Sequence, residues 1–77
     1  MDYKQTIKDL SLILLYLTSW KEKDFGGYER SWKGYDFDIL NELAEEGYIS
    51  DSKRSKSVVI YDEGINMAKE LLKNYSI

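Results

Sequence analysis

The stretch from Asp36 to Glu46 has the spacing of an amphipathic helix. Its apolar positions recur every three or four residues, which places them on one face: Phe37, Leu40, Leu43 and Ala44. Either Asp36 or Asp38 can accept hydrogen bonds from the free amides of the first turn. Gly47 follows the last apolar position, where a left-handed residue ends many helices, so we expect the helix to stop there.

Two strand-like segments and a further helix follow. Tyr48 and Ile49 begin the first strand, and the β-branched run from Val58 to Tyr61 forms the second. The polar residues between them suit the tip of a hairpin, which would pair Ile49 antiparallel with the region of Val58 to Ile60. Asp62 is expected to cap the last helix, which carries its apolar residues on one side: Gly64, Ile65, Ala68, Leu71, Leu72 and Tyr75. We expect the leucines of the two helices to be buried together: Leu40, Leu43 and Leu71.

A first helix is predicted from Asp2 or Tyr3 to Ser19 or Trp20. At 100° per residue its broad apolar face is the expected contact with the core: Tyr3, Ile7, Leu10, Ile13, Leu14, Leu17 and Trp20. Leu12 and Leu15 fall on the other side, among polar residues such as Lys4 and Lys8. They are either scattered surface leucines or an intermolecular face. Few residues remain to cover that side, so Leu12 and Leu15 are the candidate dimer contacts.

The segment from Lys21 to Tyr35 is rich in aromatic residues and contains Gly26 and Gly27. Two adjacent glycines cost a helix interior roughly 2 kcal/mol relative to alanine, so an ordered loop is favoured over a short helix at residues 28–32. The aromatic side chains define a candidate aromatic surface: Phe25, Tyr28 and Trp32. They could stack on bases or on a protein partner. A hydrophobic lid over the core is the favoured interpretation, because a small domain needs that apolar area.

Length and composition limit the function classes. The 77 residues suit one domain, 1–77, of ordinary soluble composition. There is no Cys and no His, which removes the thiolate nucleophile, the commonest general base and the commonest metal ligands. No acidic cluster or glycine-rich segment has the spacing of a calcium or phosphate loop. We therefore expect no enzyme, no cofactor and no metal. The apolar run at Leu10–Leu17 is too short to span a bilayer, so we expect a cytoplasmic protein without a membrane partner.

Charge along the chain argues against simple DNA binding. Residues 36–52 hold six acids and no base: Asp36, Asp38, Glu42, Glu45, Glu46 and Asp51. A helix that enters the major groove lies between phosphates, and affinity there comes largely from Lys and Arg. On the helix at 36–46 the outward residues are expected to be Asp38, Asn41, Glu42, Glu45 and Glu46. The candidate nucleic-acid contacts are the basic residues of the hairpin tip, Lys53, Arg54 and Lys56, which could equally form a solvated loop.

Two resemblances cover these segments. LNELAEEGYIS followed by KSVVIYDEGINMAKELL resembles the recognition helix, wing and following helix of small bacterial winged-helix regulators. LYLTSW, SWKGYDFDILNELAEEGYISD and KSVVIYDEG are similar to a family of short bacterial proteins known only as a domain of unknown function, to which the run Trp32–Asp36 is fairly specific. The second resemblance covers nearly the whole chain and implies a compact winged-helix-like domain with no catalytic residues to carry over.

The expected fold is therefore α+β and winged-helix-like. It has three main helices and a two-stranded antiparallel β-hairpin as the wing, and the second helix of the helix-turn-helix is short or lost. The expected function is a non-catalytic protein-interaction or self-association module, acting as a homodimer or with another protein. The alternative is a dimeric DNA-binding transcriptional regulator that uses the basic wing.

Overall fold

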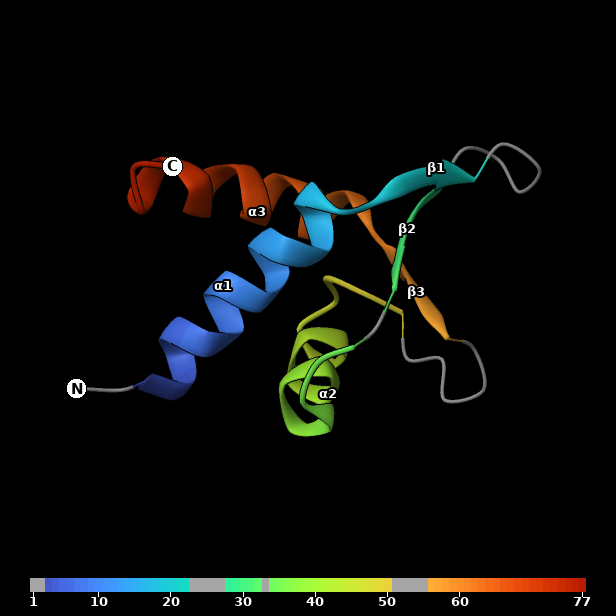
Figure 1. Ribbon diagram of the computed structural model, residues 1–77, viewed down its shortest axis with the longest axis horizontal. Coiled ribbons are helices and arrows are strands. Elements are labelled where there is room, and N and C mark those ends of the chain that lie inside the picture. Colours follow the sequence, from blue (N-terminus) through green and yellow to red (C-terminus); the bar gives the residue numbers. More distant parts are fainter. Residues whose placement is uncertain (1–2, 23–27, 33, 51–55) are drawn as a thin grey trace.

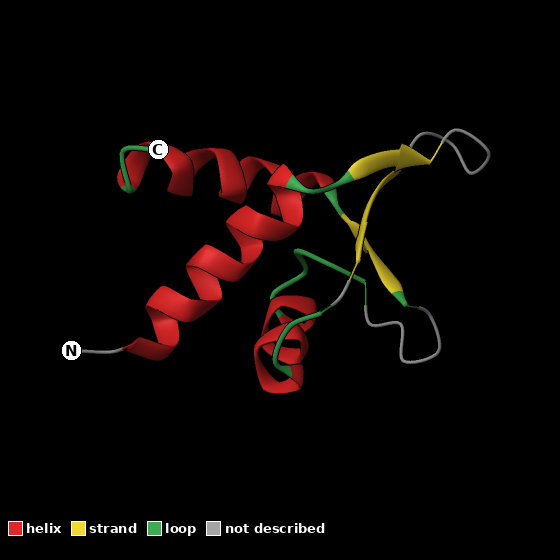
Figure 2. Ribbon diagram, in the orientation of Figure 1, coloured by secondary structure: helices red, strands yellow, loops and turns green. Residues whose placement is uncertain are grey.

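The computed structural model describes residues 3–22, 28–32, 34–50 and 56–77. Along the chain the elements are α1 (Tyr3–Leu17), β1 (Trp20–Glu22), β2 (Tyr28–Trp32), α2 (Phe37–Glu45), β3 (Ser57–Ile60) and α3 (Asp62–Asn74). The helices α1 and α3 pack against each other, and the strands extend to one side of the helices (Figures 1 and 2). These three helices and the antiparallel sheet confirm the α+β prediction.

The sheet has three strands in the order β1-β2-β3, and both pairings are antiparallel. Trp20 lies opposite Arg30, and Ser31 lies opposite Val58. Ile49 forms an isolated antiparallel bridge with Ile60, which confirms the predicted pairing of these segments. The prediction of a two-stranded wing therefore omitted the main partner of β3, which is β2.

The prediction of a loop or short helix at residues 28–32 was wrong, since these residues form β2. Strands alternate between faces, and here the inward positions are polar. Glu29 accepts a hydrogen bond from Ser19 Oγ at 2.8 Å, and Ser31 Oγ lies 3.3 Å from the hydroxyl of Thr18. Because both inward residues are polar, the segment lacks the alternation of apolar and polar positions that normally marks a strand.

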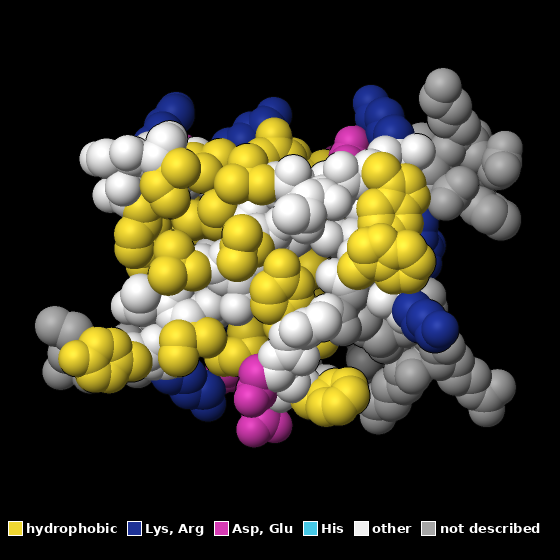
Figure 3. Space-filling model, viewed as in Figure 1, with side chains coloured by type: hydrophobic (Ala, Val, Ile, Leu, Met, Phe, Trp, Pro, Cys, Tyr) yellow, Lys and Arg dark blue, Asp and Glu magenta, His cyan; other side chains and the backbone are white. Residues whose placement is uncertain are grey.

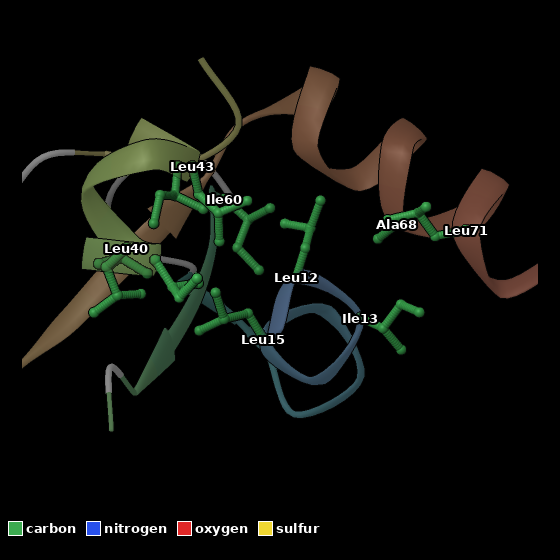
Figure 4. Close-up of a cluster of buried hydrophobic side chains, with 11 residues drawn as sticks. Leu12, Ile13, Leu15, Leu40, Leu43, Ile60, Ala68 and Leu71 are labelled. Carbon is green, nitrogen blue, oxygen red and sulfur yellow. The ribbon is translucent and has the colours of Figure 1, made fainter. Parts of the chain in front are cut away.

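The core lies between α1, α2, α3 and the sheet (Figure 4). The predicted burial of Leu40, Leu43 and Leu71 in one cluster is confirmed. α1 contributes Leu12, which is 1% exposed, and Leu15, which is completely buried. The placement of Leu12 and Leu15 on an outer, intermolecular face was therefore wrong. The remaining core residues come from all three helices, β3 and the segment before it: Ile13, Ile39, Ile49, Val58, Ile60 and Ala68.

The ends of α2 follow the sequence closely. Asp36 Oδ1 accepts hydrogen bonds from the backbone amides of Asp38 at 2.8 Å and Ile39 at 3.4 Å, which confirms the predicted N-cap. Gly47 has a φ of +84°, the left-handed conformation expected after the helix. At α3 the predicted cap was wrong: Tyr61 is the N-cap residue and makes no side-chain cap, while Asp62 is already helical.

A tight contact joins the start of α3 to the chain that enters β3. The backbone amide of Tyr61 donates a hydrogen bond to the carbonyl of Tyr48 at 3.0 Å. A Cβ added at Gly64 would lie only 2.3 Å from this same carbonyl oxygen. A glycine at position 64 therefore lets α3 approach the backbone at Tyr48.

Candidate interaction surface

The charged side chains of α1 all have partners within the molecule. Lys4 Nζ lies 3.4 Å from Glu42 Oε1, and Lys8 Nζ donates a hydrogen bond to Glu46 Oε1 at 2.5 Å. Asp9 is the third charged residue of α1. The two ion pairs draw the side of α1 that carries Lys4 and Lys8 toward α2, and Leu12 and Leu15 lie on this same side. The face predicted to be external is thus the internal one.

Asp9 is held on a different side of α1, next to α3. Its Oδ1 accepts a hydrogen bond from Gln5 Nε2 at 2.8 Å, and its Oδ2 accepts one from the hydroxyl of Tyr75 at 2.9 Å. The hydrogen bond to Asp9 raises the pKa of the Tyr75 hydroxyl, because it favours the protonated form. All three charges of α1 are therefore engaged with α1 itself, α2 or α3.

Most of the face of α1 that was predicted to form the core is instead exposed, although Ile13 on that face is buried in the core as predicted. Five of its large apolar side chains are between 38% and 66% exposed: Tyr3, Ile7, Leu10, Leu14 and Leu17. We call these five residues the outward stripe. Their spacing of four, three, four and three residues is that of a coiled-coil seam. At 100° per residue, the positions on either side of the stripe are also uncharged: Thr6, Ser11, Ile13 and Thr18.

Further apolar side chains extend the same face of the molecule. In the space-filling view, hydrophobic side chains gather along α1 and over α3, and most Lys and Arg side chains lie at the edge (Figure 3). On α3, Ile65 and Leu72 are half-buried against the core, while Tyr75 and Ile77 at its end are exposed. The surface around the outward stripe is therefore broad as well as apolar.

A second aromatic group lies over β1 and β2. The ring centroids of Trp20 and Trp32 are 5.2 Å apart, with the rings tilted by 45°. The two tryptophans are diagonal neighbours on one face of the sheet, a position from which large rings reach each other. Trp32 keeps 63% of its surface exposed. On the same face Arg30 donates hydrogen bonds to Ser57 Oγ from Nε at 3.1 Å and Nη2 at 2.8 Å.

The structure describes only part of the predicted aromatic surface. Trp32 is an exposed residue of β2 and does not lie in the predicted loop. Tyr28 begins β2, but its side chain is outside the described part of the structure, as is the whole of Phe25. The predicted aromatic surface as a set is therefore untested.

The predicted nucleic-acid contacts are also only partly described. Lys56 is exposed directly before β3, whereas Lys53 and Arg54 lie outside the described residues. Two of the acids predicted to face outward pair with lysines of α1: Glu42, which is half-buried, and Glu46, which is exposed. Asp38, Asn41 and Glu45 are exposed, and α2 contains no base.

A hollow of about 190 Å³ lies between the three helices. Leu12, Leu43 and Met67 contribute apolar side chains to its wall, and Lys8, Asp9 and Glu46 contribute charges. Lys8 pairs with Glu46, and Asp9 accepts hydrogen bonds from Gln5 and Tyr75. Within the described ranges, no three acidic side chains converge closely enough to hold a metal ion. The outward stripe is therefore the more prominent candidate site.

Sequence reasoning located the apolar residues of the stripe but assigned them to the core. The signal that could have corrected this is the pairing between helices: Lys4 and Lys8 are four residues apart, and so are Glu42 and Glu46. Two such pairs can face each other when two helices pack side by side. If the two pairs are taken to face each other, the side of α1 that carries the lysines lies against α2 and the outward stripe lies at the surface.

Comparison with known proteins gives a family but no assigned activity. The chain is 38% identical over 68 residues to the "Uncharacterized protein y4hR" of Sinorhizobium fredii (strain NBRC 101917 / NGR234), an alignment that covers 87% of this chain and 84% of that protein. No solved structure matches the chain, so the winged-helix assignment stays a prediction. None of the helices in the described ranges has the length and hydrophobicity needed to cross a bilayer. Residues 3–77 match the family described as "Domain of unknown function (DUF6429)", and the chain belongs to that family, as the resemblance implied.

Proposed function

We propose that this chain is a non-catalytic protein-interaction module and that its binding surface is centred on the outward stripe of α1. The observation that carries the proposal is the absence of charge on this exposed helix face. A helix that faces water normally places charged and polar residues there, with its apolar stripe toward the core. In α1 both sides are apolar, and the charges are used in contacts with α2 and α3. A second apolar face of this kind is typical of a surface that another molecule covers.

The energy available from this surface is sufficient for specific binding. Each stripe residue is roughly half exposed, so burying the remainder contributes about 1 kcal/mol per side chain. Five such residues, with a similar gain from the partner, can offset the cost of association, which is at least about 4 kcal/mol. Tyr75, which is hydrogen-bonded to Asp9 of α1, adds exposed aromatic area, and aromatic residues are enriched at interfaces.

The chemistry of the surface favours a protein over a nucleic acid or a lipid. Nucleic acid binding depends on Lys and Arg near phosphates, and neither the stripe nor its bordering positions carry a base. Interfacial membrane helices also carry Lys and Arg on their polar side, but Lys4 and Lys8 pair with acids of α2. DNA binding through the basic segment at 53–56 remains the alternative function.

Site-specific photo-cross-linking in the cells that carry the gene tests this proposal. Benzoylphenylalanine replaces Leu10 in the stripe, and a matched variant carries it at Asn41, an exposed position of α2. We expect a discrete covalent adduct from position 10 that is absent from position 41. Adding Leu14→Glu to the position 10 variant should remove the adduct, because a buried unpaired charge is costly. No adduct, or equal adducts at both positions, would contradict the proposal.

A further inference from the structure

The outward stripe is a charge-free coiled-coil seam, and this limits the kinds of surface that can cover it. In a two-fold symmetric contact each residue near the axis meets its own copy. A charged side chain at that position would repel itself, whereas the stripe and its bordering positions carry no charge at all. The surface is therefore compatible with a second copy of itself without any adjustment.

The size of the surface agrees with such a contact. The molecule measures 41 × 24 × 18 Å, and Figure 3 views it along the shortest axis, so the apolar face lies across the two longer dimensions. A stable interface covers about 800 Å² on each partner. An interface of that size would use the adjoining surface of α3 as well as the outward stripe of α1. Protomers of 77 residues also have small cores, which makes association an effective source of stability.

The order of the stripe residues favours one arrangement. Leu10 is at the middle of α1, with Tyr3 and Leu17 at equal distances of seven residues on either side. Two helices that run antiparallel would place Leu10 against Leu10 and Tyr3 against Leu17. This arrangement also sets the N-terminus of each helix beside the C-terminus of the other, which is favourable for the helix dipoles. Building on the function proposed above, we infer that the partner is a second copy of this chain, joined as a two-fold dimer with the two α1 helices antiparallel.

The oligomeric state in solution is the first test. Light scattering on a size-exclusion column should give twice the chain mass of 9.1 kDa for the purified protein. Leu14→Glu should halve the measured mass, since two charges would be buried in the interface. Phe37→Glu is the matched control, because it places the same charge on a 75% exposed apolar residue of α2. It should leave the dimer mass unchanged. Circular dichroism of both variants checks that they are folded.

Single cysteines test the arrangement, and the chain has no native Cys that would interfere. Under mild oxidation Leu10→Cys should give a disulfide-linked dimer. Tyr3→Cys and Leu17→Cys should each stay unlinked alone and become linked when the two variants are mixed. Linkage of each of these two variants with itself would show parallel helices and would overturn the arrangement.

The outcomes separate this inference from the proposed function. A purified protein of 9.1 kDa at millimolar concentration overturns the dimer. If position 10 still gives a photo-adduct with a different protein in cells, the interaction surface stands and only the second copy is wrong. If no adduct forms and the protein is monomeric, both are wrong. A folded Leu14→Glu variant that remains a dimer also overturns the inference, because the stripe would then lie outside the interface.

Discussion

At the scale of single residues, the two informative glycines have different tasks. Gly47 adopts a left-handed conformation directly after α2. Gly64 has no unusual backbone angle. A glycine is required there because a side chain would collide with the carbonyl oxygen of Tyr48. The first role can be read from the sequence, because it depends on local helix geometry. The second depends on two segments sixteen residues apart and becomes visible only in the folded chain.

Gly64→Ala should therefore destabilise the protein. The added methyl group would force α3 away from Tyr48, and overpacking of this kind typically costs about 1–3 kcal/mol. Gly34→Ala is the matched control, because nothing lies within 4 Å of a Cβ at that position. Urea unfolding of both variants measures the difference. Equal free energies of unfolding for the two variants would contradict the close approach at Gly64.

Lys8 provides a prediction for pH. The hydrogen bond to Glu46 raises the pKa of the Lys8 ammonium in the folded state above its usual value of about 10.4. A raised folded-state pKa means that the pair stabilises the fold fully below the unfolded-state pKa, and this contribution is lost as the pH rises through the folded-state pKa. Lys8→Met should thus be less stable than the parent near neutral pH, and the gap should narrow above about pH 10.4. Urea unfolding at pH 7 to 11 measures the gap. A gap that stays constant would contradict this role of the ion pair.

At the scale of elements, α1 is the segment in which sequence and structure differ most. Both of its sides are apolar, and periodicity alone cannot say which one is internal. The larger side, with Leu10 and Leu14, is exposed, and the smaller side, with Leu12 and Leu15, is buried. The ion pairs with α2 lie on the buried side, so they agree with this orientation of α1.

The two sides of α1 should respond differently to truncation. In a Leu14→Glu background, where association is expected to be lost, Leu15→Ala should cost about 2–5 kcal/mol, because it leaves a cavity in the core. Leu17→Ala in the same background should change stability by no more than about 0.5 kcal/mol, since Leu17 is exposed. Thermal and urea unfolding give both values. A large loss at Leu17 would place part of the outward stripe in the core of the isolated chain.

Other elements were predictable to different degrees. The cap at Asp36 and the end of α2 at Gly47 follow from local signals, and the bridge between Ile49 and Ile60 follows from the hairpin pattern of the two segments. The strands β1 and β2 were missed because Glu29 and Ser31 point inward and form hydrogen bonds with the residues that follow α1. The candidate interaction surface was not predicted, because the residues of the outward stripe were identified but assigned to the core.

At the scale of the whole molecule, the distribution of charge separates the two candidate functions. The net charge of the sequence is −3. The acids of α2 that remain exposed, among them Asp38 and Glu45, are accompanied by no base in that helix. The basic segment holds three residues, Lys53, Arg54 and Lys56. A DNA-binding surface built on α2 would therefore depend on a few charges outside the helix.

We expect DNA binding to be weak, independent of sequence and lost at physiological salt. Three phosphate contacts would give a salt slope of only about −2.7 in a double-logarithmic plot. Fluorescence anisotropy with a labelled random duplex and with a fragment of the gene's own promoter, at low and at physiological salt, measures this. Lys56→Ala is the variant to compare, because Lys56 is the described member of the basic segment. Tight binding to the promoter alone that persists at physiological salt would favour the regulator instead.

The pairing of β2 with β3 has a consequence for how the chain is made. These strands are joined only after α2 has been added between them, and the core also needs Ala68 and Leu71 from α3. While the ribosome is still adding α3, the nascent chain can form the β1–β2 hairpin and helical turns, but it cannot close its core. The side of α1 that packs against α3 stays uncovered during that interval. A chaperone that binds emerging hydrophobic segments would meet α1 before its contacts with α3 exist.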